Sequence, residues 1–77
     1  MNKKSDEYWY SVIRKNIRKI RLEKGFTQAQ VGELTDLSRE YITDIENENR
    51  NKHFTIAVLG RLSLAFETDI KEFFKED

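Results

Sequence analysis

The stretch that decides the fold reads TQAQVGELTDLSREYITDIE and covers residues 27–46. It contains two helix starts, because Thr27 and Ser38 are residue types whose side-chain oxygens cap the first turn of a helix. Gln30, three residues after Thr27, completes the sequence pattern of a capping box. Apolar residues recur at helical spacing after each start, without the sustained two-residue alternation of a strand. The stretch therefore predicts two short helices joined by a tight turn at Asp36.

A basic helix is predicted before this stretch, because Ile13, Ile17 and Ile20 recur at helical spacing. The cations on its other faces, expected to be mostly exposed to solvent, are Arg14, Lys15, Arg18 and Lys19. The helix is expected to end at Gly25, since glycine tolerates the left-handed conformation that closes many helices. Residues 1–10 are expected to form an N-terminal arm. Its Tyr8-Trp9-Tyr10 run either packs on the domain or lies between subunits.

Two more helices are predicted after the central stretch. Thr55 is expected to cap the first of them, and Thr68 or Asp69 starts a short last helix. The apolar stripe expected on the longer helix consists of Ile56, Leu59, Leu62 and Phe66. The chain is therefore predicted to fold as an all-α, five-helix compact domain that covers residues 11–77.

The composition limits what else the chain can do. It has 77 residues, no cysteine and a single histidine, His53, so one domain is expected, with neither disulfides nor a metal site. No run approaches the roughly 20 apolar residues of a membrane helix, and the N-terminus lacks the apolar stretch of a signal peptide. We therefore expect a cytoplasmic protein. Without a catalytic set or a glycine-rich phosphate cradle, we expect neither an enzyme nor a cofactor or small-molecule ligand.

The net charge of zero hides an uneven distribution. Residues 1–25 carry eight Lys and Arg against three Asp and Glu, a balance of +5. Residues 26–51 have a balance of −4, and residues 52–77 a balance of −1. Such asymmetry favours a localised anion-binding face, although an ordinary solvated helix face has the same composition.

The second helix of the central pair carries groups that suit DNA. Short helix pairs with a tight turn are one way to fit a helix into the major groove. The outward residues of this second helix, which have donors or acceptors for base edges, are Ser38, Arg39, Glu40 and Thr43. Gly32, in the middle of the preceding helix, costs about 1 kcal/mol relative to alanine. It therefore implies a close approach of the second helix, which we expect to press there through Ile42.

Several spaced features resemble the Cro/repressor (Xre-type) helix-turn-helix family, which has a lambda-repressor-like DNA-binding fold. They are KIRLEKGFTQ at residues 19–28, Val31-Gly32, and the stretch from Ile42 to Glu46. The resemblance runs from about residue 11 to residue 74. Within the family, LSREYI at residues 37–42, Ile45-Glu46 and Arg50-Asn51 look most like restriction–modification controller proteins. A phage-type repressor remains open as an alternative. The loop at residues 52–54 looks about two residues longer than in typical controller proteins.

The resemblance implies roles for individual residues. The helix from Ser38 would enter the major groove, with base-reading residues Ser38, Arg39, Glu40 and Thr43. Phosphate contacts would come from Gln28, Tyr41, Arg50 and Asn51. Arg21 and Glu46 would form a structural ion pair. Two simpler interpretations stay open: Arg39 and Glu40 could form a surface ion pair, and Thr43 could merely be exposed.

The last predicted helix suggests a dimer. Ile70, Phe73 and Phe74 are more large apolar residues than a small core should leave exposed, so we expect part of the segment to close the core against Phe66 and part to form a two-fold interface. Because palindromic operators mirror two-fold proteins, the prediction is a homodimer on double-stranded DNA with a palindromic operator.

The sequence thus predicts a DNA-binding transcriptional regulator, with control of a restriction–modification system as its candidate role. The alternative is an antitoxin or another protein-interaction module, which the acidic balance of residues 26–51 keeps open.

Overall fold

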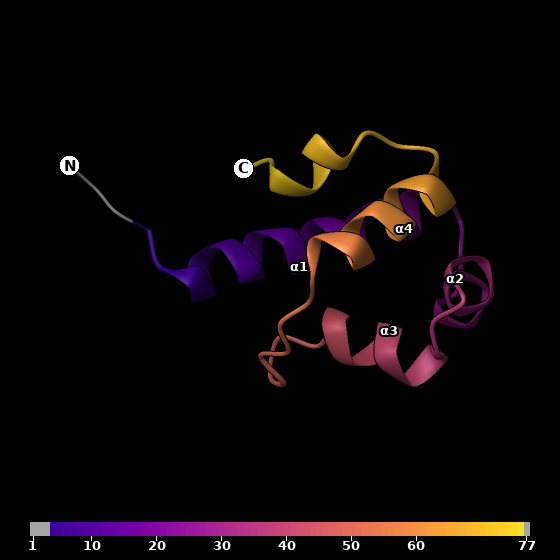
Figure 1. Ribbon diagram of the computed structural model, residues 1–77, viewed down its shortest axis with the longest axis horizontal. Helices are drawn as coiled ribbons and strands as arrows, with labels where there is room; N and C mark the ends of the chain where they lie inside the picture. Colours follow the sequence, from indigo (N-terminus) through magenta and orange to yellow (C-terminus); the bar gives the residue numbers. More distant parts are fainter. Residues whose placement is uncertain (1–3, 77) are drawn as a thin grey trace.

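The computed structural model describes residues 4–76 (Figure 1). The elements in chain order are α1 (Asp6–Glu23), α2 (Gln28–Thr35), α3 (Arg39–Glu46), α4 (Ile56–Phe66) and the 3₁₀-helix η1 (Ile70–Phe74). No strand occurs within residues 4–76, so the all-α prediction is confirmed. The prediction of five α-helices is wrong, because the last five-residue segment is a 3₁₀-helix. No helix in this part of the chain is long and apolar enough to span a membrane.

The first helix begins earlier than predicted. The Ser5 hydroxyl accepts a hydrogen bond from the Tyr8 amide at 3.1 Å, and Asp6 and Glu7 lie in the first turn, where the helix dipole favours acidic side chains. The prediction of an arm over residues 1–10 is therefore wrong for residues 6–10, which are helical. Residues 1–3 of that predicted arm lie outside the described residues.

The other predicted helix starts are confirmed. Thr27 and Gln30 form the capping box: the Thr27 hydroxyl accepts from the Gln30 amide at 3.1 Å, and the Gln30 side chain accepts from the Thr27 amide at 2.8 Å. Ser38 and Thr55 cap α3 and α4 by accepting from the amide three residues further on, and Asp69 caps η1. These caps satisfy amides that have no partner inside their helices, so they set where each helix begins.

Gly32 permits the tight turn between α2 and α3. A Cβ at this position would lie 2.9 Å from the Leu37 carbonyl oxygen and 3.2 Å from the Arg39 amide nitrogen. The close approach that we predicted is present, but its partner is the backbone of the turn and the first residue of α3. Ile42, which we expected to press on Gly32, lies about one helical turn after Arg39 and is buried in the core.

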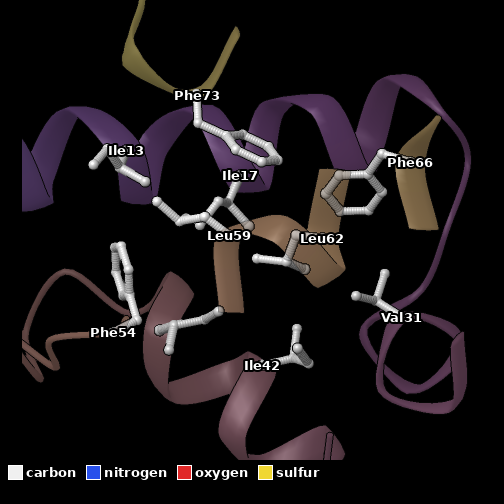
Figure 2. Close-up of a cluster of buried hydrophobic side chains, with 10 residues drawn as sticks. Ile13, Ile17, Val31, Ile42, Phe54, Leu59, Leu62, Phe66 and Phe73 are labelled. Atoms are coloured by element: carbon white, nitrogen blue, oxygen red, sulfur yellow. The ribbon is translucent and has the colours of Figure 1, made fainter. Parts of the chain in front are cut away.

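The core is a cluster of apolar side chains from every helix (Figure 2). Its ten buried members are Ile13, Ile17, Val31, Ile42, Ile45, Phe54, Leu59, Leu62, Phe66 and Phe73. The α4 stripe is confirmed except for Ile56, which is 67% exposed. At about 100° of rotation per residue, Ile56 points about 60° away from Leu59 and about 120° away from Leu62, so it leaves the buried face.

The C-terminal segment returns over α1 (Figure 1). Asn16 of α1 donates hydrogen bonds to the carbonyl oxygens of Phe73 and Lys75, both at 2.8 Å. Phe73 has no exposed surface and meets the ring of Phe66 edge-on at a centroid distance of 6.2 Å. Closure of the core against Phe66 is thus confirmed. The assignment of Phe73 to a dimer interface is wrong, because its side chain is fully buried in the core of the same chain.

Replacing Phe73 tests this placement. Phe73→Ala should lower the free energy of unfolding by about 3–5 kcal/mol, because it removes a fully buried ring and leaves a cavity. The measurement is urea unfolding followed by circular dichroism. Phe74→Ala is the matched control, since that ring is 39% exposed and its loss should cost only about 1 kcal/mol. Equal losses for the two variants would contradict the placement of Phe73.

Candidate nucleic-acid interface

The outward face of α3 brings the predicted base-reading residues together. Ser38, Arg39 and Glu40 are exposed, and Thr43 is half-buried one turn further along. A shallow hollow of about 210 Å³ on this face is lined by Arg39, Glu40, Thr43 and Asp44. Within residues 4–76 neither Arg39 nor Glu40 has an ion-pair partner, so the simpler interpretation of an Arg39–Glu40 ion pair is not what the structure contains. Both side chains are free to meet a ligand.

A hydrogen-bonded network lies behind this face and joins three helices. The Thr43 hydroxyl lies 2.9 Å from Gln28 Oε1 and 3.0 Å from the Arg39 carbonyl oxygen, either of which can accept its proton. Gln28 Nε2 in turn donates to Glu46 Oε1 at 3.1 Å. Thr43 is therefore more than an exposed side chain, because it helps to orient Gln28 at the start of α2.

The network ends in an ion pair between α1 and α3. Arg21 Nε donates to Glu46 Oε2 at 2.7 Å, and Arg21 Nη2 donates to Glu46 Oε1 at 3.0 Å. The two side chains are only 8% and 2% exposed, and Arg21 Nη1 also donates to the Phe26 carbonyl oxygen at 2.8 Å. This two-pronged geometry is the strong form of an arginine–carboxylate contact. The structure thus pairs the two residues that the resemblance links.

Three of the predicted phosphate-contacting residues border α3, and the fourth, Tyr41, lies on it. Gln28 and Tyr41 are half-buried, whereas Arg50 and Asn51 are exposed in the loop between α3 and α4. Burial raises the pKa of the Tyr41 hydroxyl above its ordinary value, so this group keeps its proton and can donate it. Arg50 lies 3.5 Å from Asp44 Oδ2, a weak surface contact that an anionic ligand can displace.

Sequence reasoning missed two cations near this surface. Lys52, in the loop after α3, holds its ammonium group 5.1 Å from the centre of the Tyr41 ring. Arg14, expected to face solvent, is only 2% exposed and donates hydrogen bonds to the carbonyl oxygens of Ile45 and Lys52. The only sequence signal for this burial is that Arg14 follows Ile13 and borders the apolar stripe of α1.

The remaining cations of α1 face a groove beside the end of α3. Lys15, Arg18 and Lys19 are exposed, as predicted. They line an open groove of about 760 Å³ whose other wall includes Glu46 and residues 47–49. The basic helix α1 and the end of α3 therefore present neighbouring surfaces, although they lie far apart in the sequence.

Breaking the buried ion pair should destabilise the whole arrangement. Arg21→Met or Glu46→Gln should each lower the free energy of unfolding by about 3–5 kcal/mol, because either change leaves one buried charge without its partner. Urea unfolding measures this loss. Lys15→Ala provides the control, since its ion pair with Glu48 at 3.7 Å is exposed and should contribute less than about 1 kcal/mol. Similar small effects for both pairs would refute a structural role for Arg21 and Glu46.

Comparisons with known proteins agree with this geometry. The helix-turn-helix family model matches residues 17–73. The transcriptional regulator RamB of Mycobacterium tuberculosis is 34% identical over 61 residues, which are 79% of this chain and 12% of RamB. This chain thus spans only a small part of RamB's length. The uncharacterized transcriptional regulator YqaF of Bacillus subtilis is 37% identical over 59 residues, which cover 77% of this chain and 78% of YqaF.

A solved structure shows the same arrangement. The restriction–modification controller protein C.Esp1396I superimposes with a TM-score of 0.72 at 33% identity, covering 96% of this chain and 100% of that protein. The proteins similar to this chain are regulators rather than enzymes, in agreement with the sequence-based prediction. The matched helices are those that carry the network and the exposed face of α3. The chain belongs to the helix-turn-helix family, in its Cro/repressor (Xre-type) form.

Proposed function

We propose that this protein is a sequence-specific DNA-binding transcriptional regulator that binds a palindromic operator as a homodimer, with α3 in the major groove. One observation carries the proposal: Arg39, Glu40 and Thr43 share the outward face of α3, with the exposed Ser38 at its N-terminal cap, while the opposite face is anchored in the core. A rigidly held helix on which Arg39 and Glu40 have no ion-pair partner within residues 4–76 suits the reading of base edges.

The four side chains suit different base edges. Arg39 can donate two hydrogen bonds to guanine. The Ser38 hydroxyl accepts from the Tyr41 amide and can still donate its proton, whereas the Thr43 hydroxyl donates within the protein and can still accept. Glu40 can accept a hydrogen bond from the amino group of cytosine. Where no cytosine supplies this bond, nothing compensates for the repulsion between its carboxylate and the phosphates. Glu40 thus favours one base and disfavours sequences that do not supply it.

Phosphate contacts beside α3 would set its register on the duplex. Gln28 donates one Nε2 proton to Glu46, which leaves the second proton for a phosphate oxygen. Tyr41 donates its hydroxyl proton, and Arg50 exchanges its weak contact with Asp44 for a phosphate. Asn51 follows Arg50 in the same exposed loop. Such contacts position a protein without reading the sequence.

The dimer interface is proposed at the C-terminal end of the domain. Ile70 is half-buried and Phe74 is 39% exposed, so both retain surface for a partner after Phe73 is excluded. Phe74 shares an apolar hollow of about 150 Å³ with Trp9, Tyr10 and the 67%-exposed Ile56. A second copy related by a two-fold axis would cover the same patch on both chains, as a dimer on a palindrome requires.

Control of a restriction–modification system is the candidate role within this class. It is supported by the likeness to the controller protein C.Esp1396I, which extends over 96% of this chain. Restriction and methyltransferase genes beside this one would support that role, and their absence would favour a phage-type repressor.

Selection from a random duplex library at physiological salt, followed by sequencing, tests the proposal. The expected result is an enriched inverted repeat whose half-sites are about one helical turn apart. Affinity should fall by about 10³–10⁵ between about 50 and 200 mM salt, as for a dimer that contacts six to ten phosphates. No binding would instead favour the antitoxin or protein-interaction alternative. Binding without enrichment would refute sequence specificity.

Replacing Arg39 tests base reading. Arg39→Ala should weaken operator binding by about 1–3 kcal/mol per half-site and relax the preference at one base pair, because a two-pronged contact to guanine is lost. Competition binding with operator variants measures both effects. Arg18→Ala removes the same charge from the exposed face of α1 and should leave the base preference unchanged. Unchanged specificity in Arg39→Ala would overturn the assignment.

Replacing two exposed apolar residues tests the interface. The double variant Ile56→Asp and Phe74→Asp should sediment as a folded monomer, because it places carboxylates in the proposed contact while sparing the core. Leu64→Asp is the control: Leu64 is also on α4 and is 81% exposed, but it lines a different hollow with Leu34. Monomers from Leu64→Asp, with dimers from the double variant, would move the interface to that other surface.

A further inference from the structure

Arg14 is a buried cation whose partners are backbone carbonyl groups. Its side chain crosses from α1 to the end of α3, where Nε donates to the Ile45 carbonyl oxygen at 3.0 Å and Nη2 donates to the Lys52 carbonyl oxygen at 2.7 Å. The residue is 2% exposed, and within residues 4–76 no carboxylate lies within ion-pair distance of it. Burying a charge is costly unless hydrogen bonds and favourable dipoles compensate for the lost hydration.

The position of Arg14 supplies that compensation. Ile45 lies in the last turn of α3, where carbonyl groups lack partners within the helix and the helix dipole is negative. One prong of the guanidinium therefore closes the end of α3. The other prong reaches seven residues further along the chain, to Lys52. The two hydrogen bonds hold the carbonyl groups of Ile45 and Lys52 at a fixed separation, and these two residues flank most of the loop that connects α3 to α4.

Arg50 and Asn51, the two loop residues to which we assign phosphate contacts, lie between the anchored carbonyl groups of Ile45 and Lys52. Arg50 and Asn51 are exposed, and Asn51 has the left-handed backbone conformation, with φ of 49°. Beyond Lys52, His53 stacks on Tyr10 of α1 at a ring-centroid distance of 3.9 Å, and Phe54 is buried in the core. No hydrogen bond to α1 is present from Arg50 or Asn51 themselves within the described chain. Among residues 4–76, Arg50 has polar contacts only with α3 and its own loop, through its amide to the Asn47 carbonyl oxygen at 3.1 Å and its side chain to Asp44 at 3.5 Å. The position of both residues relative to α1 therefore depends on the anchors on either side of them.

We propose that Arg14 is a positioning residue for DNA binding: it clamps the loop between α3 and α4 so that Arg50 and Asn51 meet the phosphate backbone while α3 lies in the groove. This inference rests on the proposed function. An arginine fits this task because its planar fork donates to two fixed acceptors at once, whereas a lysine ammonium group on a flexible stem does not. If stability alone were needed, an apolar side chain of similar volume would serve without burying a charge.

A double-mutant cycle separates positioning from stability. The variants are Arg14→Lys, which keeps the charge but loses the fork, and Arg50→Gln, which removes the loop's phosphate contact. The matched control is Asn16→Ala: Asn16 is also buried on α1 and also donates to two backbone carbonyl groups, but those belong to the C-terminal segment. The probe is a duplex of about 30 base pairs that carries the sequence enriched from the random library, long enough for two half-sites. Binding is measured at a temperature at which circular dichroism shows each variant to be folded.

The readout is the slope of the logarithm of the binding constant against the logarithm of the salt concentration. In the otherwise unaltered protein and in Asn16→Ala, Arg50→Gln should reduce this slope by about 1 per subunit, as expected for one lost phosphate contact. In Arg14→Lys the slope should already be reduced, and Arg50→Gln should change it little further. An equal effect of Arg50→Gln in all three backgrounds would overturn the proposal. Failure of the unaltered protein to bind the duplex would instead overturn the proposed function, and the inference with it.

A second measurement uses the unaltered protein and does not depend on whether Arg14→Lys folds. The Nε–H resonance of Arg14 in nitrogen-15 NMR spectra should exchange slowly with water in the free protein. It should keep its chemical shift when the duplex binds, because the clamp is formed before binding. Exchange as fast as that of an exposed arginine, or a large shift on binding, would show that no preformed clamp exists and would overturn the proposal.

Discussion

The buried ion pair between Arg21 and Glu46 is the constraint on which the arrangement of the helices depends. It joins α1 to the last residue of α3, and through Gln28 and the Phe26 carbonyl group it also holds the start of α2. Neither α2 nor α3 exceeds eight residues, a length at which an isolated helix is not stable in water. Their positions must therefore come from tertiary contacts, and this pair supplies a directional contact that apolar packing lacks.

Apolar packing and polar contacts divide the two faces of α3 between them. Ile42 and Ile45 are fully buried, so the inner face is held by the core, while Arg39 and Glu40 remain exposed and unpaired within the described chain. Gly32 lets the turn before α3 approach α2 closely, because it has no side chain to collide with the backbone of Leu37 and Arg39. The result is a short helix that is rigid on one side and accessible on the other.

Tertiary pairing also lowers the acidic charge that residues 26–51 would present to DNA in the proposed function. Three of the six carboxylates in residues 26–51 have a cationic partner: Glu46 with Arg21, Asp44 with Arg50, and Glu48 with Lys15. Two of these partners come from the basic first helix. The two partners from α1 offset part of the acidic balance that favoured a protein-interaction module, whereas Glu40 and Asp44 both line the hollow on the outward face of α3.

The sequence by itself determined the features that depend on neighbouring residues. The caps at Thr27, Ser38 and Thr55 were predicted, because a cap involves groups only three residues apart. The family resemblance was also read from short stretches of neighbouring residues. The early start of α1 at Asp6 also has a local signal, in Ser5 and the acidic residues after it.

Only the tertiary structure decided which residues with ambiguous patterns are buried. The position of Arg14 next to the apolar stripe of α1 does not distinguish a buried cation from an exposed one. Its burial depends on carbonyl groups 31 and 38 residues away. Phe73 and Phe74 are adjacent and chemically identical, yet one is fully buried and the other is 39% exposed, because Asn16 fixes how the C-terminal segment lies on α1. Such choices depend on contacts between distant parts of the chain, which composition and spacing do not specify.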